Sequence, residues 1–156
     1  MMADRCSADR VVAVARRWVG TPYRHQASLE GVGADCLGLV RGIWREVVGA
    51  EPEAVPAYTA DWAESREGER QMAATARVMR AVPAASARPG DVLLFRMKAR
   101  GVAKHLGILA AGTPEAGRLI HAYAGHAVCE TAIGPAWARR LAGCFRFPLT
   151  DGTETD

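Results

Sequence analysis

The spacing of the apolar residues changes once along this chain, at the tetrapeptide Arg88-Pro89-Gly90-Asp91. Before that point apolar side chains recur at the period of an amphipathic helix, and after it they alternate as they do in strands. Proline at the second position of the tetrapeptide and glycine at the third predict a type II turn. Helices followed by strands, without regular alternation between the two, predict an α+β fold.

Two helices are expected before the turn. The first begins at Ser7 or Asp9, whose side chains suit the N-cap position, and it ends at Gly20. A turn-rich loop follows over residues 21–34, and a second helix with an apolar stripe is expected over residues 36–47.

The middle segment of the chain, residues 51–82, carries no recognisable motif. Residues 51–60 contain two prolines and are expected to be irregular. Residues 61–82 repeat apolar side chains at helical spacing, which predicts a further helix.

The chain after the turn predicts an antiparallel sheet of about five strands. The loops between the strands are too short for crossover helices, and several contain glycine or proline, which favours hairpins. The expected strands cover residues 92–97, 105–111, 119–123, 127–133 and 144–147.

Length and composition restrict the class of protein. A chain of 156 residues with 49% hydrophobic content predicts one domain over residues 1–150, followed by a polar tail over 151–156. The formal charge is only +3 and the arginines are scattered, which argues against nucleic-acid binding. No stretch approaches 18 apolar residues, so no membrane insertion is expected. The N-terminal residues lack the apolar core of a signal peptide, which predicts synthesis in the cytoplasm.

The four cysteines show no C-x-x-C spacing. A zinc ribbon and a thioredoxin-like redox motif are therefore not indicated, and we expect free thiols. Neither a cofactor nor a bound metal is expected.

The segment GADCLG, residues 33–38, places Cys36 in the first turn of the second helix. Unpaired N–H groups and the helix dipole favour the thiolate there, which predicts faster alkylation near neutral pH than for the two cysteines in later strands. The small neighbours Ala34 and Gly38 would let a substrate backbone approach the sulfur. Cys36 also lies in phase with the apolar stripe, and on its own this segment favours a packing role.

A pair of histidines changes that balance. His105 and His121 occupy expected strands that would form a hairpin through residues 112–117. A register centred on Thr113 places the two histidines directly opposite each other, and one centred on Pro114 makes them diagonal neighbours, roughly 7 to 8 Å apart. Both registers bring the two rings to one face of the sheet.

A cysteine at a helix start that faces two histidines supplies a nucleophile, a base and a residue that orients the base. His105 would accept the thiol proton, and His121 would fix the tautomer of His105. Two alternatives stay open. The histidines could make only structural hydrogen bonds, or they could bind a metal with Cys36, completed by Asp35 or Cys129.

Five segments in register, WVGTPY, DCLGLV, RPGDVLLF, HLGIL and LIHAY, make the chain resemble the NlpC-type cell-wall cysteine peptidases. This family is a bacterial and phage branch of the papain-like superfamily, and the resemblance extends over residues 11–147. It implies a papain-like fold in which N-terminal helices pack on a C-terminal sheet.

The resemblance also implies roles for individual residues. Cys36 would be the nucleophile, His105 the general base and His121 the residue that orients the imidazole. Tyr23 would point its hydroxyl toward the sulfur and assist the oxyanion, and Asp35 would help to receive a free amino end of the substrate. The implied reaction cleaves the peptidoglycan stem peptide between the γ-carboxyl of D-glutamate and a diamino acid, through a thioester.

Within the family, GTPYRHQAS and GADCLGLVRGIWRE resemble the phage-tail subgroup, which includes the tail-tip peptidase of gene transfer agents. The implied partners are tail-tip or baseplate hub proteins. A phage-like particle would carry the enzyme to the periplasm of the target cell. Two other functions stay open: a non-catalytic tail-tip adaptor with the same fold, and an acyltransferase or amidase of the same superfamily. An intact triad argues against the adaptor.

Overall fold

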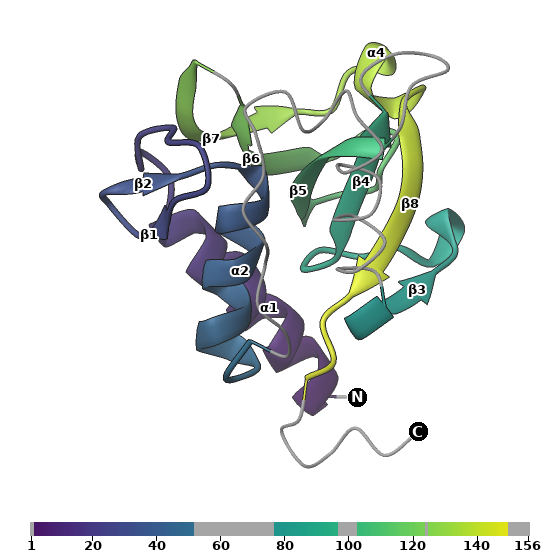
Figure 1. The fold of residues 1–156 in the computed structure, drawn as a ribbon. Coiled ribbons are helices and arrows are strands. Elements are labelled where there is room, and N and C mark those ends of the chain that lie inside the picture. Colours follow the sequence, from purple (N-terminus) through teal and green to yellow (C-terminus); the bar gives the residue numbers. More distant parts are fainter. Residues whose placement is uncertain (1, 52–76, 97–102, 124, 150–156) are drawn as a thin grey trace.

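The computed structural model describes residues 2–51, 77–96, 103–123 and 125–149. Two helices, α1 (Met2–Arg17) and α2 (Cys36–Val47), lie side by side against a six-stranded sheet (Figure 1). Every neighbouring pair in this sheet is antiparallel. The α+β class predicted from the change of period is therefore confirmed.

The sheet has the strand order β3-β8-β4-β5-β6-β7. Its central strands β4, β5 and β6 follow one another along the chain, and α2 packs over β5 and β6. The strands are β3 (Arg80–Val82), β4 (Val92–Arg96), β5 (Ala103–Ala111), β6 (Arg118–Tyr123), β7 (His126–Ala132) and β8 (Leu141–Arg146).

The five expected strands are present with ends that differ by one to three residues, and the structure adds β3. The expectation of a helix through residue 82 is wrong at its end, because residues 80–82 pair with β8. This pairing joins segments more than sixty residues apart, so it leaves no trace in the local apolar period. Residues 61–76 of that expected helix lie outside the described residues.

The first helix is also longer than expected. It begins at Met2, ahead of Ser7 and Asp9, so neither of those residues is its N-cap. Methionine, alanine and arginine at the start of the chain are good helix formers, which explains the added turn.

The turn that separates the two halves forms as predicted. The N–H of Asp91 donates to the carbonyl of Arg88 at 3.0 Å, and Gly90 has φ of +100°. The Asp91 carboxylate is buried, accepts from the Arg88 N–H at 2.9 Å and pairs with Arg146 at 2.8 Å. These contacts fix the start of β4 against β8.

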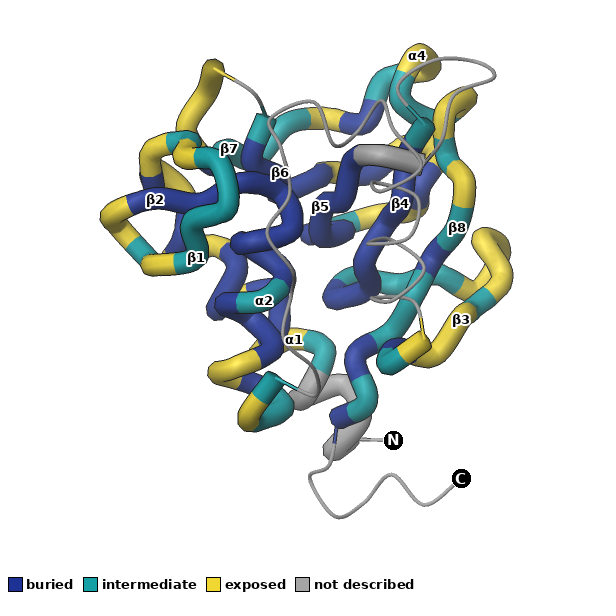
Figure 2. The backbone as a smooth tube through the Cα atoms, viewed as in Figure 1, coloured by how far each residue is buried: buried dark blue, intermediate teal, exposed yellow. Residues whose placement is uncertain are grey.

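Both faces of the sheet are covered (Figure 2). On one face, alternate residues such as Leu94, Leu106 and Ile108 pack against the apolar stripes of α1 and α2. On the other face, residues such as Phe95 form a second cluster, which the short helix α4 (Pro135–Ala138) covers through Trp137. Successive residues of β5 therefore point into two different cores.

The loop between the helices contains a short hairpin, β1 (Ser28–Leu29) and β2 (Gly33–Ala34). Leu29 and Val32 at its outer end are more than half exposed. The hairpin leads through Asp35 directly into α2, so it holds the start of that helix. Within the described residues, no helix is both long enough and apolar enough to cross a bilayer.

Candidate active site

Cys36 is the first residue of α2, as the sequence predicts. Asp35 is the N-cap: its backbone is extended, and its Oδ1 accepts from the N–H of Gly38 at 2.7 Å. This is the bond that an N-cap aspartate makes to an unpaired N–H of the first turn. The thiol of Cys36 is thereby held at a capped helix start, and the residue is 6% exposed.

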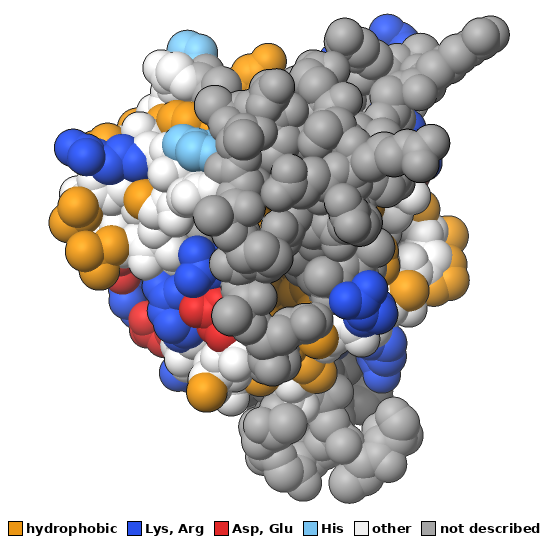
Figure 3. Space-filling model, viewed as in Figure 1, with side chains coloured by type: hydrophobic (Ala, Val, Ile, Leu, Met, Phe, Trp, Pro, Cys, Tyr) orange, Lys and Arg blue, Asp and Glu red, His pale blue; other side chains and the backbone are white. Residues whose placement is uncertain are grey.

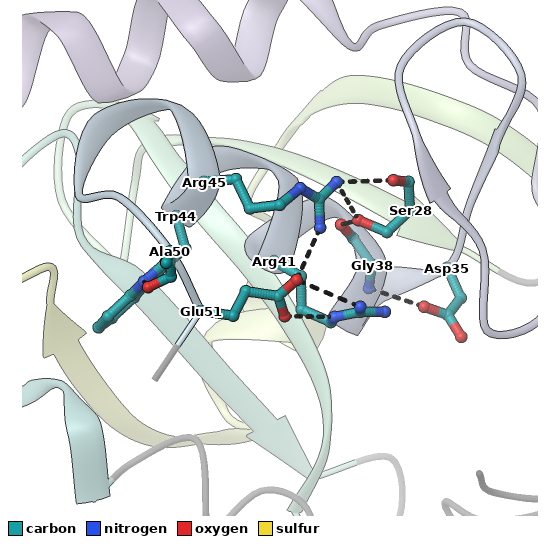
Figure 4. Close-up of polar contacts among 8 residues, drawn as sticks. All are labelled: Ser28, Asp35, Gly38, Arg41, Trp44, Arg45, Ala50 and Glu51. Atoms are coloured by element: carbon teal, nitrogen blue, oxygen red, sulfur yellow. Dashed lines mark hydrogen bonds and ion pairs between the residues drawn. The ribbon is translucent and has the colours of Figure 1, made fainter. Parts of the chain in front are cut away.

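A loop packs against this first turn where Gly38 has no side chain. A Cβ at position 38 would overlap the carbonyl oxygen of Ala27. The Ser28 hydroxyl donates to the carbonyl of Gly38 at 2.7 Å, and Arg45 donates to the carbonyl of Ser28 at 2.7 Å (Figure 4). The expectation that Gly38 leaves room for a substrate backbone is therefore wrong, because the protein's own loop fills that space.

Arginine pairs on α2 support the same loop from outside. Glu51 accepts from Arg41 at 2.7 Å and from Arg45 at 3.0 Å. Figure 3 shows basic and acidic side chains side by side in this part of the surface. Arg45 thus links Ser28, in the loop before α2, to Glu51, four residues beyond the end of that helix (Figure 4).

The second oxygen of Asp35 holds the residues before the hairpin. Oδ2 accepts from the N–H of Gln26 at 2.7 Å, and Nδ1 of His25 lies 4.0 Å away. Gln26 has φ of +66°, a left-handed conformation that is uncommon for a residue other than glycine. The carboxylate thus has structural partners on both oxygens, and its role toward a substrate amine stays a prediction.

Tyr23 lies beside this helix start. It forms a parallel bridge with Ala34 and packs, half-buried, against the core that includes Cys36. Burial raises the pKa of the Tyr23 hydroxyl to about 12, and the nearby groups Cys36 and Asp35 add to the effect. The phenol is therefore protonated at neutral pH and can donate a hydrogen bond in the neighbourhood of the sulfur.

The two histidines meet across the β5–β6 hairpin. The pairs Ile108↔Ile120 and Leu109↔Leu119 show the register centred on Pro114, so the histidines are diagonal neighbours. Nε2 of His105 and Nδ1 of His121 are 2.8 Å apart, and the ring centroids are 5.0 Å apart. This second of the two expected registers brings the rings into direct hydrogen-bond contact.

Aromatic side chains enclose the histidine pair. Trp137 of α4 lies 5.3 Å from the ring of His105 and 5.6 Å from that of His121, measured between centroids. Phe95 and Tyr123 lie on either side, with centroids 6.3 and 5.8 Å from that of His105. Nothing in the local sequence around Trp137 indicates that α4 lies against the two histidines.

Thr131 is a second residue that sequence reasoning missed. Its Oγ1 lies 3.1 Å from Nε2 of His121, so both ring nitrogens of His121 have a hydrogen-bond partner. The contact depends on the register of β7 against β6, in which Leu119 pairs with Thr131. Alternation along the expected strand over residues 127–133 could have indicated which face of the sheet Thr131 occupies, but not that its partner is His121.

Burial keeps both imidazoles neutral. It lowers the pKa of His105 to about 3, with a further contribution from His121, and it lowers the pKa of His121 to about 4. His105 and His121 are only 6% and 3% exposed as whole residues, so water stabilises a positive charge on either imidazole poorly.

Burial also dominates the thiol. It raises the pKa of Cys36 to about 12, and Asp35 adds to that rise. Hydrogen bonds from backbone N–H groups, first among them that of Leu106, act in the opposite direction but are weaker. The expectation that the helix start favours a thiolate is therefore wrong for the resting protein, because desolvation outweighs the helix terminus.

The N–H of Leu106 connects the thiol to the histidine pair. It reaches the Cys36 sulfur, and Leu106 directly follows His105 in β5. The Nε2 atom of His105 is engaged with His121. Since Nε2 faces His121, Nδ1 is the ring nitrogen of His105 to which the thiol proton would have to move.

The last histidine of the chain lies at the edge of this arrangement. His126 is exposed at the start of β7, with its ring 5.9 Å from that of Tyr123. Among the described residues, no group of three or more histidine, cysteine or carboxylate side chains is arranged to hold a metal ion. The arrangement can supply a nucleophile, a base and hydrogen-bond donors.

A buried thiol at a helix start, held against the strand that carries a hydrogen-bonded histidine, is the arrangement that papain-like thiol hydrolases use. The chain matches the NlpC/P60 family over residues 20–146, and it belongs to that family. Members of this family are cell-wall cysteine peptidases and related hydrolases.

Individual relatives agree with this assignment. The chain is 30% identical over 147 residues to the gamma-DL-glutamyl hydrolase of Bacillus subtilis, a match that covers 93% of this chain and 31% of that protein. The chain therefore spans less than a third of that relative.

Solved structures share the fold. The NlpC/p60 domain of the peptidoglycan hydrolase SagA superposes with a TM-score of 0.61 at 22% identity, over 90% of this chain and 98% of that one. An NlpC/P60 family protein from Bacillus cereus has a TM-score of 0.65 at 22% identity, over 90% of this chain and 40% of that one.

Proposed function

We propose that this chain is a cysteine endopeptidase that cleaves the peptidoglycan stem peptide at the bond between D-glutamate, through its γ-carboxyl, and a diamino acid. The observation that carries the proposal is the pair His105–His121, hydrogen-bonded at 2.8 Å, in which His105 lies on β5, the strand that contacts the Cys36 sulfur through Leu106. The name of the Bacillus subtilis relative, a gamma-DL-glutamyl hydrolase, supports the choice of bond.

The neutral state of the three groups determines the order of events. Cys36 attacks the amide carbonyl as its proton moves to Nδ1 of His105, because neither the thiolate nor the imidazolium is favoured at rest. The imidazolium then donates this proton to the leaving amine, and a thioester forms on Cys36. Water, activated by the same imidazole, hydrolyses the thioester and frees the γ-glutamyl product.

Two kinds of donor can stabilise the oxyanion in this mechanism. The backbone N–H of Cys36 lies at the start of α2, where N–H groups have no partner within the helix. The Tyr23 hydroxyl remains protonated because its pKa is raised to about 12. Asp35, with His25 beside its Oδ2, would receive the free amino end of the substrate.

Digestion of purified peptidoglycan tests the proposal. The wild-type chain should release muropeptides with new amino termini on the diamino acid, identified by mass spectrometry. Cys36→Ala should release none, whereas Cys129→Ala, a matched deletion of another thiol, should keep the wild-type rate. Equal release by Cys36→Ala and the wild type would contradict the mechanism. Release of a transfer product without hydrolysis would instead support the acyltransferase alternative.

We further propose that a phage-like particle carries this enzyme on its tail and that it acts in the periplasm of the target cell. The support is the resemblance of GTPYRHQAS and GADCLGLVRGIWRE to the phage-tail subgroup. Tail-tip or baseplate hub proteins would be its partners. Purified particles from the source cells should contain this chain and open cell walls less well when it carries Cys36→Ala. Absence of the chain from particles would contradict delivery by a tail, and normal function with Cys36→Ala would favour a non-catalytic adaptor.

A further inference from the structure

The imidazole of His121 is held at both of its nitrogens. Nδ1 lies 2.8 Å from Nε2 of His105, and Nε2 lies 3.1 Å from the hydroxyl oxygen of Thr131. A ring bonded at one nitrogen can rotate by half a turn and exchange that nitrogen for a carbon, whereas a ring bonded at both cannot do so without losing two bonds. The Thr131 contact therefore determines how His121 is oriented toward His105.

The sheet fixes Thr131 in this place. β7 pairs with β6 so that His121 faces Cys129 and Leu119 faces Thr131, which makes Thr131 a diagonal neighbour of His121 on the same face. Threonine is branched at Cβ and has few side-chain rotamers in a strand. Trp137 covers the same ring at a centroid distance of 5.6 Å and limits access of water.

The direction of the hydrogen bonds follows from the proton transfer. When His105 takes the thiol proton at Nδ1, its Nε2–H donates and Nδ1 of His121 must accept. His121 must then carry its own proton at Nε2, where an acceptor is needed because the ring is buried. The Thr131 oxygen is that acceptor.

We infer that Thr131 is a positioning residue, which acts through His121 to hold the ring orientation and the Nε2–H tautomer required when His105 accepts a proton. The inference rests on the proposed function for its effect on rate. Its effect on the His121 ring does not depend on any substrate.

Paired variants at this position test the inference. Thr131→Val keeps the branched shape and removes the hydroxyl, and Thr131→Ser keeps the hydroxyl. We expect Thr131→Val to lower kcat by about tenfold, the effect of losing about one hydrogen bond, with KM little changed. Thr131→Ser should recover most of the rate. Thr113→Val removes a hydroxyl from the exposed β5–β6 turn and should leave kcat unchanged.

Nitrogen-15 NMR of the folded protein provides the readout that does not depend on activity. In the wild type and in Thr131→Ser, His121 should show one tautomer, protonated at Nε2. In Thr131→Val the His121 signals should shift toward a mixture of tautomers while the melting temperature stays close to that of the wild type.

Two results would overturn the inference. One is an unchanged His121 tautomer together with an unchanged kcat in Thr131→Val. The other is an equal loss of rate and of melting temperature in Thr131→Val and Thr131→Ser, which would show a packing role. Failure of the proposed function would look different from failure of this inference. In that case the wild type itself would release no muropeptides, while the NMR comparison of the His121 tautomer could still be made.

Discussion

His105 and His121 are hydrogen-bonded to each other across the β5–β6 hairpin, with Nε2 of the first 2.8 Å from Nδ1 of the second. Both rings are buried and both have a strongly lowered pKa. A neutral pair of this kind can take a proton only when the charge it acquires is compensated by the reacting substrate. In the proposed mechanism, the contact thus connects the fold of the sheet to the step in which His105 accepts the thiol proton.

Substitution of His121 should separate orientation from charge. His121→Asn can keep an acceptor toward Nε2 of His105, so we expect a partial rate. His121→Ala removes the acceptor and should lower kcat by roughly 10² to 10⁴, the range associated with general acid–base groups. Steady-state kinetics on a peptide with a D-γ-glutamyl bond would measure both. A rate for His121→Ala equal to that of the wild type would contradict a role in orienting His105.

The buried histidines also predict how stability depends on pH. Their folded-state pKa values, about 3 and about 4, lie below the usual value of about 6.5, so the unfolded chain binds more protons between these limits. The free energy of unfolding should therefore fall as the pH decreases from about 7 to about 4. The slope should approach about one proton per histidine, roughly 1 kcal/mol per pH unit, only in the middle of that window, once the pH is well below 6.5.

His121→Asn is the variant that checks this dependence, because it removes one of the two titrating groups. Urea unfolding at a series of pH values should give a slope smaller by about one proton for the variant than for the wild type. Parallel pH profiles for the two proteins would mean that His121 is not held neutral in the folded state.

Thiol reactivity should follow burial and not position in the helix. Cys36 is buried and its pKa is raised to about 12, whereas Cys129 is only half-buried. At pH 7, iodoacetamide should therefore alkylate Cys36 more slowly than Cys129, and the Cys36 rate should increase as the pH is raised. Peptide mapping by mass spectrometry measures both rates. First modification at Cys36 near neutral pH would show that the resting thiol ionises more readily than its burial implies.

Gly38 should tolerate no side chain. Because a Cβ there would overlap the carbonyl of Ala27, Gly38→Ala should lower the free energy of unfolding by about 1 to 3 kcal/mol. Gly134→Ala is the matched control, since no atom lies within 4 Å of a Cβ at that position. Urea unfolding of both variants tests the difference. Equal stability of the two would mean that the loop does not pack on α2 as described.

Strand alternation explains why the histidine contact could be predicted. In an antiparallel hairpin, His105 and His121 share a face in every register with an even sum of paired residue numbers. Their contact could therefore be predicted without knowing the exact residues of the turn. The cap at Asp35 was similarly local, since it needs only residues 35–38.

The features that escaped prediction depend on contacts between distant parts of the chain. The pKa of Cys36 is determined by how deeply the sulfur is covered, which the helix start alone does not reveal. The placement of Thr131 and Trp137 beside His121 depends on the register of β7 and the position of α4. β3 likewise forms only because β8 lies next to it.

The central claim is that Cys36 and His105 act as one catalytic unit, and the most direct measurement compares single and double variants. We would measure kcat/KM on a peptide with a D-γ-glutamyl–diamino acid bond for Cys36→Ala, His105→Ala and the double variant. When two groups work as one unit, the fold-losses in kcat/KM of the single variants do not multiply in the double variant. We expect the double variant to be no slower than Cys36→Ala alone. Losses that multiply, or wild-type activity in Cys36→Ala, would contradict it.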